Sequence, residues 1–455
     1  MANKGKFQAI KGTRDLLPPE TELWNRVEST AREVFGTFGF GEIRPPIFED
    51  QRLFERSVGA ETDIVTKELY TFFNVPSSRE IRTSIESETA SHSKESITDS
   101  RELSEVPKLA LRPEATASVC RAYIEHNMNQ WPAPVKLYYL GPMFRRERPQ
   151  KGRYRQFYQI GAEVLGGTDA PGIDAEVIEM VMAFFGKLGL QGVQLEINSI
   201  GHYAPECRRG YVEKLRAALT EVKDKLGEDS RRRIETNPLR VLDSKLEHEQ
   251  PIIAALPRIG DSLCDECKSH YREVQRQLEM RGVAYRENWR LVRGLDYYMR
   301  TTFEITAQGL GSQNAVCGGG RYDGLVELLG GPPTKGIGFA IGEDRLILSL
   351  QEADKGGPAP RRDVYIAWLG AKAQGTAIVV ARKLREAGLR VELPAVEQRF
   401  GKALGQADKL GAKYALILGE DEVASGQWTV KKLADGSQEK VAAEEVVGKL
   451  RDGEW

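Results

Sequence analysis

The feature that most constrains the fold is a short segment near residue 358 that interrupts both helices and strands. From position 355 the sequence reads Lys-Gly-Gly-Pro-Ala-Pro-Arg-Arg. Glycine and proline break regular structure of either kind, so we expect a linker at 355–360 between two separately folded parts. The chain has 455 residues, which is enough for two to four domains of roughly 100 to 200 residues each.

The part after the linker alternates strand and helix patterns. Apolar runs typical of strands occur at 364–369, 389–393 and 414–418, and helical patterns at 376–387 and 402–410 lie between them. Strands that alternate with helices indicate a small α/β domain around a largely parallel sheet. We expect this domain to span residues 361–455.

The part before the linker follows a different pattern. A helix with one apolar face is predicted at 22–38. The extended segment after it contains Pro45 and Pro46, which cannot donate hydrogen bonds to a neighbouring strand. That segment therefore suits a sheet edge or an interface. From 108 to 165 and from 290 to 306, short apolar and aromatic runs alternate with turns, which predicts antiparallel strands. We expect an α+β domain built on an antiparallel sheet from residues 1–204 and 286–354.

Two segments interrupt this domain. Residues 77–106 are rich in serine and contain no aromatic residue, so we interpret them as a mobile insertion; a contact with a partner is the alternative. Residues 205–285 are rich in charge and in helical patterns, with Tyr211, Leu215 and Leu219 along one face. We expect them to form a separate helical insertion domain.

Overall charge and hydropathy exclude several classes of protein. The 65 Lys and Arg residues balance 66 Asp and Glu residues, so net charge favours no partner. No apolar run approaches the roughly 18 residues of a membrane helix, and the first residues lack the apolar core of a signal peptide. We expect a cytoplasmic protein that contacts no membrane.

The cysteines and histidines predict neither a disulfide framework nor a metal site. Five cysteines are thinly spread, and only Cys264 and Cys267 form a CxxC pair. The second pair that a zinc site needs is missing from the sequence nearby, where only His270 is close. Cys317 stands among glycines that match no phosphate-loop pattern, so we expect tight glycine packing around a strand there.

The most unusual local charge lies at 143–159. Six basic residues face one acid, Glu147, and aromatic residues are interleaved with them. A solvated surface is one interpretation. Because arginine binds phosphate with two donors and aromatic rings stack on bases, the alternative is a hairpin that binds a nucleotide or nucleic acid. The basic residues are Arg145, Arg146, Arg148, Lys151, Arg153 and Arg155.

Three other segments with charged or aromatic residues each leave two interpretations open. Arg112 and Glu114 flank a proline before a helix that Thr116 or Ser118 can begin, which a simple helix cap also explains. The segment 291–301 places charges and two tyrosines near a glycine, either as ion-paired strand residues or as a polar pocket. Arg345 follows a glycine-rich strand and stands at a helix start, where it can face solvent or a polyphosphate.

Taken in order, five segments resemble the class II aminoacyl-tRNA synthetases and, within them, the histidyl-tRNA synthetase family. The resemblance runs from Lys11 to the C-terminus. The arginine tract resembles the second class II motif, residues 336–346 the third, and the helix with Pro45 and Pro46 the first, which lies at the dimer interface of the family. The segments are Lys11-Gly-Thr-Arg-Asp-Leu-Leu-Pro, Leu111-Arg-Pro-Glu-Ala-Thr, 141–157, Leu291-Val-Arg-Gly-Leu-Asp-Tyr-Tyr and Gly318-Gly-Gly-Arg-Tyr-Asp-Gly-Leu.

The resemblance implies that histidine is adenylated by ATP with Mg²⁺ and then transferred to tRNA(His). It implies that Arg145 holds the α-phosphate and that Phe157 and Arg345 sandwich the adenine, with Arg345 also near the γ-phosphate. Arg293 would stabilise the charge that develops at the α-phosphate. In this chemistry positioning and charge stabilisation carry most of the catalysis.

The same resemblance implies where histidine and tRNA bind. Histidine's amino group would meet Glu114, Thr116 and Gln159, and its ring would meet Glu163, Tyr297 and Tyr298, with Tyr322 lining the site. The acceptor end of tRNA would contact Arg148, Gln150, Lys151 and Arg153, and residues 361–455 would bind the anticodon.

The sequence departs from the family in two places and leaves two rival functions. Ala115 replaces a common glycine, and the serine-rich insertion is long. The rivals are an inactive regulatory paralogue and an RNA-binding or signalling protein that reuses the fold without its chemistry.

Overall fold

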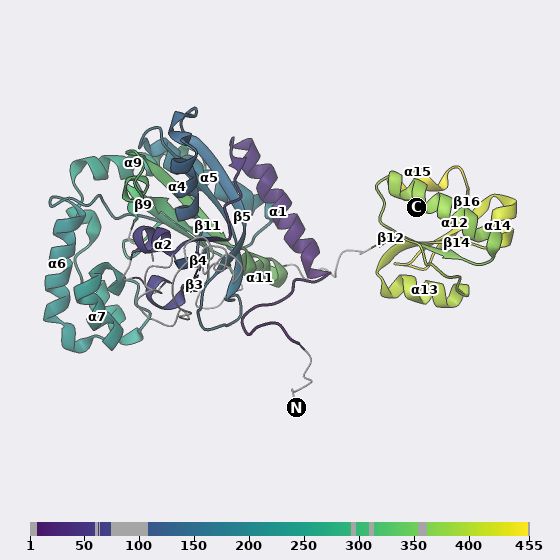
Figure 1. Ribbon diagram of the computed structural model, residues 1–455, viewed down its shortest axis with the longest axis horizontal. Coiled ribbons are helices and arrows are strands. Elements are labelled where there is room, and N and C mark those ends of the chain that lie inside the picture. Colours follow the sequence, from purple (N-terminus) through teal and green to yellow (C-terminus); the bar gives the residue numbers. More distant parts are fainter. Residues whose placement is uncertain are drawn as a thin grey trace, which may run out of the picture. The chain divides into compact units, whose positions relative to one another are not determined.

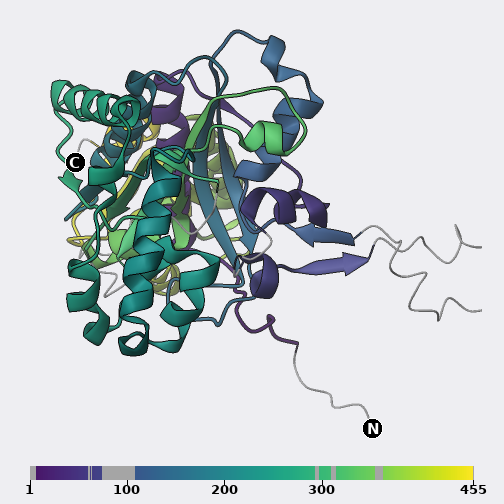
Figure 2. The same ribbon diagram turned by 90° about the vertical axis from the view of Figure 1, so that its left-hand side faces the viewer.

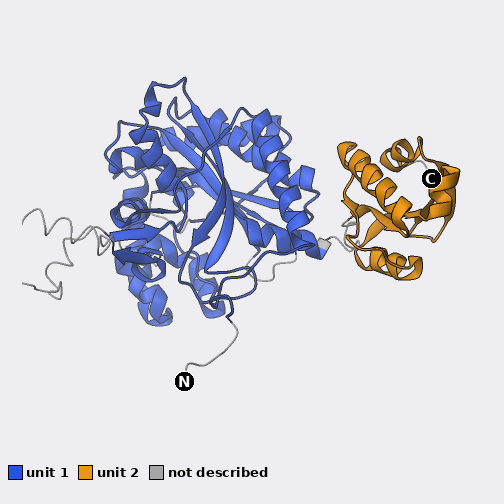
Figure 3. Ribbon diagram, turned by 45° about the vertical axis from the view of Figure 1, so that its right-hand side comes forward, with its two compact units in different colours: residues 1–354 blue, residues 355–455 orange. Residues whose placement is uncertain are grey.

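The computed structural model describes residues 7–59, 62, 64–73, 108–292, 297–308, 314–353 and 362–453. It divides into two compact units, residues 1–354 and 355–455, which are blue and orange in Figure 3. The predicted linker at 355–360 and the serine-rich segment at 77–106 lie outside the described residues. Within the described part, no helix combines the length and apolar content that crossing a membrane requires.

An eight-stranded sheet forms the centre of the first unit (Figure 1). Its six central strands pair antiparallel, as the sequence predicts, whereas the short edge strands pair parallel with their neighbours. In spatial order the strands are β1 (Gly41–Glu42), β5 (Val135–Phe144), β6 (Gln156–Leu165), β11 (Gly336–Gly342), β10 (Ala315–Arg321), β9 (Met299–Thr306), β7 (Gln194–Ser199) and β8 (Arg286–Glu287).

One face of this sheet is covered by α1 (Glu20–Thr37), α5 (Pro171–Leu188) and α11 (Glu343–Ala353). The predicted helix at 22–38 is confirmed as α1. Its residues Val27, Ala31 and Phe35 follow each other at helical spacing and are fully buried. The Phe35 ring lies 5.7 Å from Tyr138 of β5 and 5.8 Å from Phe339 of β11, so the apolar stripe of α1 packs directly on the sheet.

Residues 205–285 are helical, as predicted, and stay within the first compact unit. Figure 2 shows them in teal at the front. They enclose a core of their own around Tyr211, Leu215 and Ile253, whereas Val274 and Leu278 of the last helix join the core beneath the large sheet. The helices are α6 (Arg208–Glu221), α7 (Glu228–Thr236), α8 (Gln250–Ala254) and α9 (Asp265–Met280).

The segment with Pro45 and Pro46 continues from the edge strand β1, which confirms its expected edge position. The prolines contribute acceptors: the Arg112 guanidinium donates to the carbonyls of Pro45 at 2.7 Å and Pro46 at 3.2 Å. Beyond them lies a three-stranded sheet in the order β2 (Phe48–Asp50), β4 (Lys108–Leu111), β3 (Thr71–Phe73). The remaining helices of this unit are α2 (Gln51–Val58), α4 (Thr116–Glu125) and α10 (Leu325–Leu328).

The second unit contains a five-stranded sheet in the order β13 (Val391–Glu392), β12 (Arg362–Trp368), β14 (Ala412–Leu418), β15 (Gln427–Lys432), β16 (Gln438–Ala442). The first three strands are parallel, but β15 and β16 are antiparallel, so the expectation of a largely parallel sheet is wrong for this half. Its polar hairpin strands carry too few apolar residues to show as strands in the sequence. Helices α12 (Ala371–Glu386) and α15 (Val446–Asp452) cover one face and α13 (Phe400–Lys409) the other; α14 (Glu420–Ser425) follows β14.

Candidate active site

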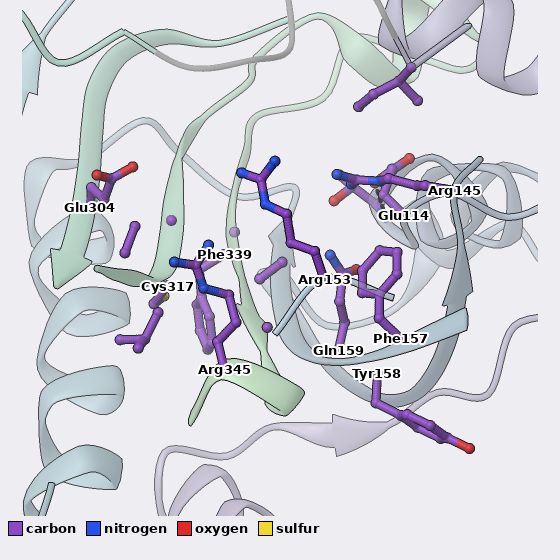
Figure 4. Close-up of a pocket in the computed structure, with 18 of the residues that line it drawn as sticks. Glu114, Arg145, Arg153, Phe157, Tyr158, Gln159, Glu304, Cys317, Phe339 and Arg345 are labelled. Carbon is purple, nitrogen blue, oxygen red and sulfur yellow. Dashed lines mark hydrogen bonds between the residues drawn. The ribbon is translucent and has the colours of Figure 1, made fainter. Parts of the chain in front are cut away.

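A pocket of about 450 Å³ lies over the central strands of the large sheet. Side chains from β6, β10, β11, α4 and the arginine-rich hairpin line it, and Figure 4 shows many of them converging. The structure thus brings most of the predicted site residues together, although Arg293 lies outside the described residues. The predicted residues that line the pocket are Glu114, Thr116, Arg145, Arg153, Phe157, Gln159, Glu163, Tyr297, Tyr298, Tyr322 and Arg345.

Glu163 of β6 is the most deeply buried carboxyl group of the pocket, with 1% of its surface exposed. The Thr116 hydroxyl donates to one carboxyl oxygen at 2.7 Å, and the Tyr322 hydroxyl donates to the other. Burial raises the pKa of Glu163 to about 8, although these two hydrogen bonds oppose the shift. The raised pKa favours the protonated form of Glu163 at neutral pH.

Gly338 of β11 makes room for this carboxyl group. It pairs with Glu163 across the β6–β11 ladder. A Cβ atom built at Gly338 would stand 1.7 Å from Oε2 of Glu163, far inside van der Waals contact. The absence of a side chain at position 338 is therefore a steric requirement of the pocket.

Glu114 caps helix α4. Its carboxylate accepts hydrogen bonds from the backbone N–H groups of Thr116 at 2.6 Å and Ala117 at 3.0 Å. The helix-cap interpretation of this motif is confirmed, and the same side chain also lines the pocket. Burial raises the pKa of Glu114, opposed by the hydrogen bonds from these residues.

Gln159 supplies an unused acceptor. Its side-chain oxygen, Oε1, is buried and has no hydrogen-bond partner in the described structure. A buried amide oxygen without a partner costs free energy until a donor reaches it, about 1–3 kcal/mol. Because Gln159 lines the pocket, a ligand with an N–H donor can fill this position.

Three tyrosines form an aromatic wall. The Tyr297 ring lies 4.8 Å from Tyr298 and 5.7 Å from Tyr322, measured between ring centroids, and Tyr298 and Tyr322 are buried. The wall adjoins Glu163, to which Tyr322 is bonded. This part of the pocket therefore suits a flat ring that carries hydrogen-bonding nitrogens.

The opposite part of the pocket is cationic. Figure 4 shows Arg153 and Arg345 extending into it, with Arg145 and Phe157 on its other side. The Arg145 guanidinium lies 5.2 Å from the Phe157 ring centroid and donates to the Pro113 carbonyl at 3.0 Å. Burial and the nearby charge of Arg153 lower the pKa of Arg345. Positive charges gathered in this way favour a polyanion.

Asp344, next to Arg345, fixes the start of α11. Its carboxylate accepts from the backbone N–H of Tyr158 at 2.9 Å and from the Arg14 guanidinium at 3.1 Å. These bonds tie α11 to strand β6 and to the N-terminal segment. They therefore hold Arg345 at a defined place beside the sheet.

Three residues at the tip of the arginine-rich hairpin lie outside the pocket. Gln150 and Arg153 exchange backbone hydrogen bonds of 3.1 and 2.9 Å around Gly152, whose φ of +74° suits the tight turn. Arg148, Gln150 and Lys151 are exposed there, whereas Arg153 lines the pocket and lies 3.4 Å from Glu147.

A second cluster contradicts an expectation from the sequence. Cys207 and His202 lie close to Cys264 and Cys267, and the four possible ligand atoms are all within 4.8 Å of one another. The sequence prediction that the CxxC pair lacks close partners other than His270 is wrong. Nε2 of His270 instead lies 3.0 Å from the carbonyl oxygen of Asp169, so His270 is not one of these four residues.

Comparison with known proteins accounts for nearly the whole chain. Residues 70–346 match the family model "Histidyl-tRNA synthetase", and residues 363–453 match "Anticodon binding domain". A curated histidine-tRNA ligase from Koribacter versatilis is 53% identical over 98% of this chain and 96% of its own length. The chain belongs to the histidyl-tRNA synthetase family. A second histidine-tRNA ligase, from Solibacter usitatus, is 51% identical to this synthetase over 98% of the chain and 99% of its own length.

Solved structures agree with this assignment. The apo histidyl-tRNA synthetase of S. aureus matches this synthetase with a TM-score of 0.74 and 33% identity, over 98% of this chain and 100% of that one. A Bacillus halodurans protein described as an ATP phosphoribosyltransferase regulatory subunit/histidyl-tRNA synthetase shares the fold, with a TM-score of 0.62 and 20% identity over 92% of this chain and 99% of that one. The high identity to the ligases decides against the regulatory paralogue and the fold-only rival.

Sequence reasoning missed several acids in the pocket of the synthetase, among them Glu304. Glu304 of β9 lines the pocket, and its charge acts on Arg345. Its position in a strand of alternating residues gave no sign that its side chain lies on the pocket face.

Proposed function

We propose that this pocket carries out both steps of histidine transfer to tRNA. The synthetase charges tRNA(His) with histidine in an ATP-dependent reaction. First, a carboxylate oxygen of histidine attacks the α-phosphorus of ATP, the bond to the bridging oxygen breaks, and pyrophosphate leaves. A hydroxyl of the terminal adenosine of the tRNA then attacks the histidyl carbonyl carbon and loses its proton to solvent, and AMP leaves with the electron pair of the broken carbon–oxygen bond.

The observation that carries this proposal is the division of one pocket into a cationic part and a part lined by buried acceptors. In the cationic part, Arg145 holds the α-phosphate of ATP. Phe157 and Arg345 enclose the adenine, and the Arg345 guanidinium also reaches the γ-phosphate. The half-buried Arg345 has no ion pair with another described residue, so a phosphate group can supply its counter-charge. Arg293 completes this part of the proposal as the residue that stabilises charge at the α-phosphate.

In the acceptor part, the histidine substrate binds through its two ends. Its ammonium group donates to the unpaired Oε1 of Gln159 and lies beside Glu114 and Thr116. Its imidazole lies against the tyrosine wall and bonds Glu163. An analogue without ring nitrogens would leave Glu163 without that partner, which can discriminate by roughly 10⁴-fold or more.

ATP enters this pocket as its Mg²⁺ complex. Glu304 and Glu147 line the cationic part and offer the carboxylate oxygens that Mg²⁺ prefers. When bound, the ion offsets the charge of the phosphates.

Two further assignments concern partners. We propose that the synthetase is a homodimer and that its second unit binds the anticodon. We also propose that it works in the cytoplasm, where tRNA is charged. Exposed apolar side chains next to the Pro45–Pro46 segment, at Ile47, Phe48 and Phe72, support a covered interface there. Sedimentation that shows only monomers at micromolar concentration would contradict the dimer.

Histidine-dependent exchange of pyrophosphate into ATP tests the first step alone. We expect exchange with histidine and none when histidine is omitted or replaced by phenylalanine. Charging of a tRNA(His) transcript then tests the second step. Failure of exchange in a folded protein would refute the adenylation proposed here.

A further inference from the structure

The cluster of His202, Cys207, Cys264 and Cys267 lies outside the catalytic pocket, since none of these residues lines it. Its members come from two segments that lie far apart in the sequence. His202 follows strand β7, Cys207 immediately precedes α6, and Cys264 and Cys267 begin α9. The four donor atoms lie within 4.8 Å of one another, which is a spacing that a single metal ion can bridge.

We propose that His202, Cys207, Cys264 and Cys267 bind one structural Zn²⁺ ion. Three thiolates and one imidazole are a known donor set for closed tetrahedral zinc sites. Zinc bonds of about 2.3 Å to sulfur and about 2.0 Å to nitrogen place ligand atoms roughly 3.6–3.8 Å apart in a tetrahedron. Nδ1 of His202 lies 3.1 Å from Sγ of Cys267 and 3.7 Å from Sγ of Cys264, so small shifts complete the geometry.

The surroundings of the cluster match a metal site. Nε2 of His202 faces a carboxylate oxygen of Glu206 at 3.9 Å, and metal-bound histidines commonly direct their second nitrogen at a carboxylate. The backbone N–H of Cys267 points at Sγ of Cys264 over 3.5 Å, a contact that favours the thiolate.

Gly201 brings the first two ligands together. Its φ is +65°, and a Cβ atom there would lie 2.6 Å from Sγ of Cys207. The loop that carries His202 is thus shaped to pass closely over the sulfur of Cys207. Such close approach is a reason for glycine at this position.

Two sulfur atoms of the cluster belong to residues that are almost completely buried. Cys207 and Cys267 are 1% and 0% exposed. A divalent ion gives these buried sulfur atoms a common partner, because it binds thiolates directly.

The ion would fasten both ends of the helical insertion to the catalytic sheet. Ile200, Cys207, Cys267 and Tyr298 share the core of the insertion. Arg208, the residue after Cys207, donates to the carbonyl of Tyr298, and Tyr298 lines the catalytic pocket. The zinc site therefore supports one wall of the histidine pocket through α6.

Metal binding by the full-length, reduced protein tests the proposal directly. We expect about one zinc per chain by elemental analysis of the purified protein. After chelation, titration with Co²⁺ should give intense tetrahedral absorption with thiolate charge-transfer bands, saturating at one equivalent and lost when Zn²⁺ is added. A protein that binds less than a tenth of an equivalent, or cobalt without thiolate bands, would overturn the site.

Matched variants distinguish the cluster from other residues of the same type. Cys264→Ser, at the half-exposed ligand, and His202→Ala should each lower cobalt affinity at least tenfold, while Cys120→Ser and His248→Ala keep it. Circular dichroism shows whether each variant is folded. Equal affinity in folded Cys264→Ser and in the parent would contradict the proposal.

A disulfide between Cys264 and Cys267 is the competing state. The structure holds all five cysteines as thiols. Thiol titration of the purified, unfolded protein should therefore count five thiols after zinc removal without reductant. A count of three in the protein as purified would show the disulfide and refute the zinc site.

Discussion

The two parts of the catalytic pocket solve opposite electrostatic problems. Around Glu163, the polar groups of the protein already bond one another: hydroxyls of Thr116 and Tyr322 hold the carboxyl group, and burial raises its pKa. Around Arg345, a second guanidinium, Arg153, adds to the same positive charge. The acceptor part is preorganised by internal hydrogen bonds, and the cationic part is completed by the charge of its ligand.

This difference predicts how each part responds to change. A rigid region held by internal hydrogen bonds tolerates almost no added volume, because the groups that form these bonds cannot move without breaking them. A region of like charges tolerates small shifts but depends on total charge. Substitutions in one part should therefore affect the binding of one substrate and leave the other largely unchanged.

Arg345→Ala should have the largest effect. Loss of this guanidinium removes charge at the polyphosphate, and loss of one such preorganised donor costs about 10²- to 10³-fold in kcat. We expect pyrophosphate exchange to fall by that factor with an increase in the KM for ATP, while the Kd of histidine without ATP stays within about twofold. Arg345→Lys should recover only part of the loss, because a lysine lacks the planar stacking surface.

The surface variant Arg276→Ala is the matched control, since this exposed arginine pairs only with neighbours on α9. It should retain parental exchange. An unchanged rate in Arg345→Ala would remove the cationic part from the mechanism.

Gly338→Ala should impair the use of histidine and leave the binding of ATP largely unchanged. The added methyl group would overlap Oε2 of Glu163 at 1.7 Å, so the carboxyl group must move. Displacement of about 1 Å at a reacting site can cost about 10²-fold, and we expect kcat/KM for histidine to fall by that order. The KM for ATP should change less than threefold. Equal losses for both substrates would show that the two parts are not independent.

The sequence predicted many of the polar and aromatic residues of this pocket because they lie within short contiguous motifs. Glu114 and Thr116 stand in one such motif, and Arg145, Phe157 and Gln159 in another, so the resemblance of each motif to the family implied a role for each residue. The antiparallel strands that carry Gln159 and Glu163 also showed in the sequence, because apolar and polar residues alternate there. Strand pairing then placed Gly338 beside Glu163 without any local signal.

The sequence could not predict the features that depend on long-range packing. His202 and Cys207 reach Cys264 and Cys267 only because the helices between them fold back on themselves. Glu304 faces the pocket because of the register of β9, which no nearby motif marks. The hairpin of β15 and β16 was missed because its exposed strands are mostly polar.

Glu163→Gln tests the pKa argument. In the free protein Glu163 holds its proton up to about pH 8, and free imidazole gains one below about pH 6.5. We expect the bound pair to share one proton, so the affinity for histidine should be level between these values. Above pH 8, Glu163 of the free protein has lost its proton, so histidine binding must take up a proton from solvent. The affinity for histidine should therefore fall up to tenfold per pH unit. Any loss caused by deprotonation of the amino group of histidine adds to this decrease.

The glutamine variant provides the baseline for that measurement. It cannot titrate, so only the amino group of histidine should affect its affinity above pH 8. At pH 7 we expect roughly 10-fold weaker binding from the lost charged hydrogen bond. Calorimetric titration between pH 6 and 9 gives both profiles, and parallel profiles above pH 8 would contradict the assigned role of Glu163.

The smallest effect is expected from substitutions at the exposed tip of the hairpin. These substitutions test where the cationic part of the pocket ends. Arg148 and Lys151 are exposed, and neither lines the pocket. Arg148→Ala or Lys151→Ala should therefore leave pyrophosphate exchange unchanged. Each should raise the KM for tRNA a few-fold and lower the salt dependence of tRNA binding by about one unit of slope, because one phosphate contact is lost. If either variant slows exchange as strongly as Arg345→Ala, the cationic part extends to the hairpin tip, and the boundary drawn here between ATP and tRNA contacts is wrong.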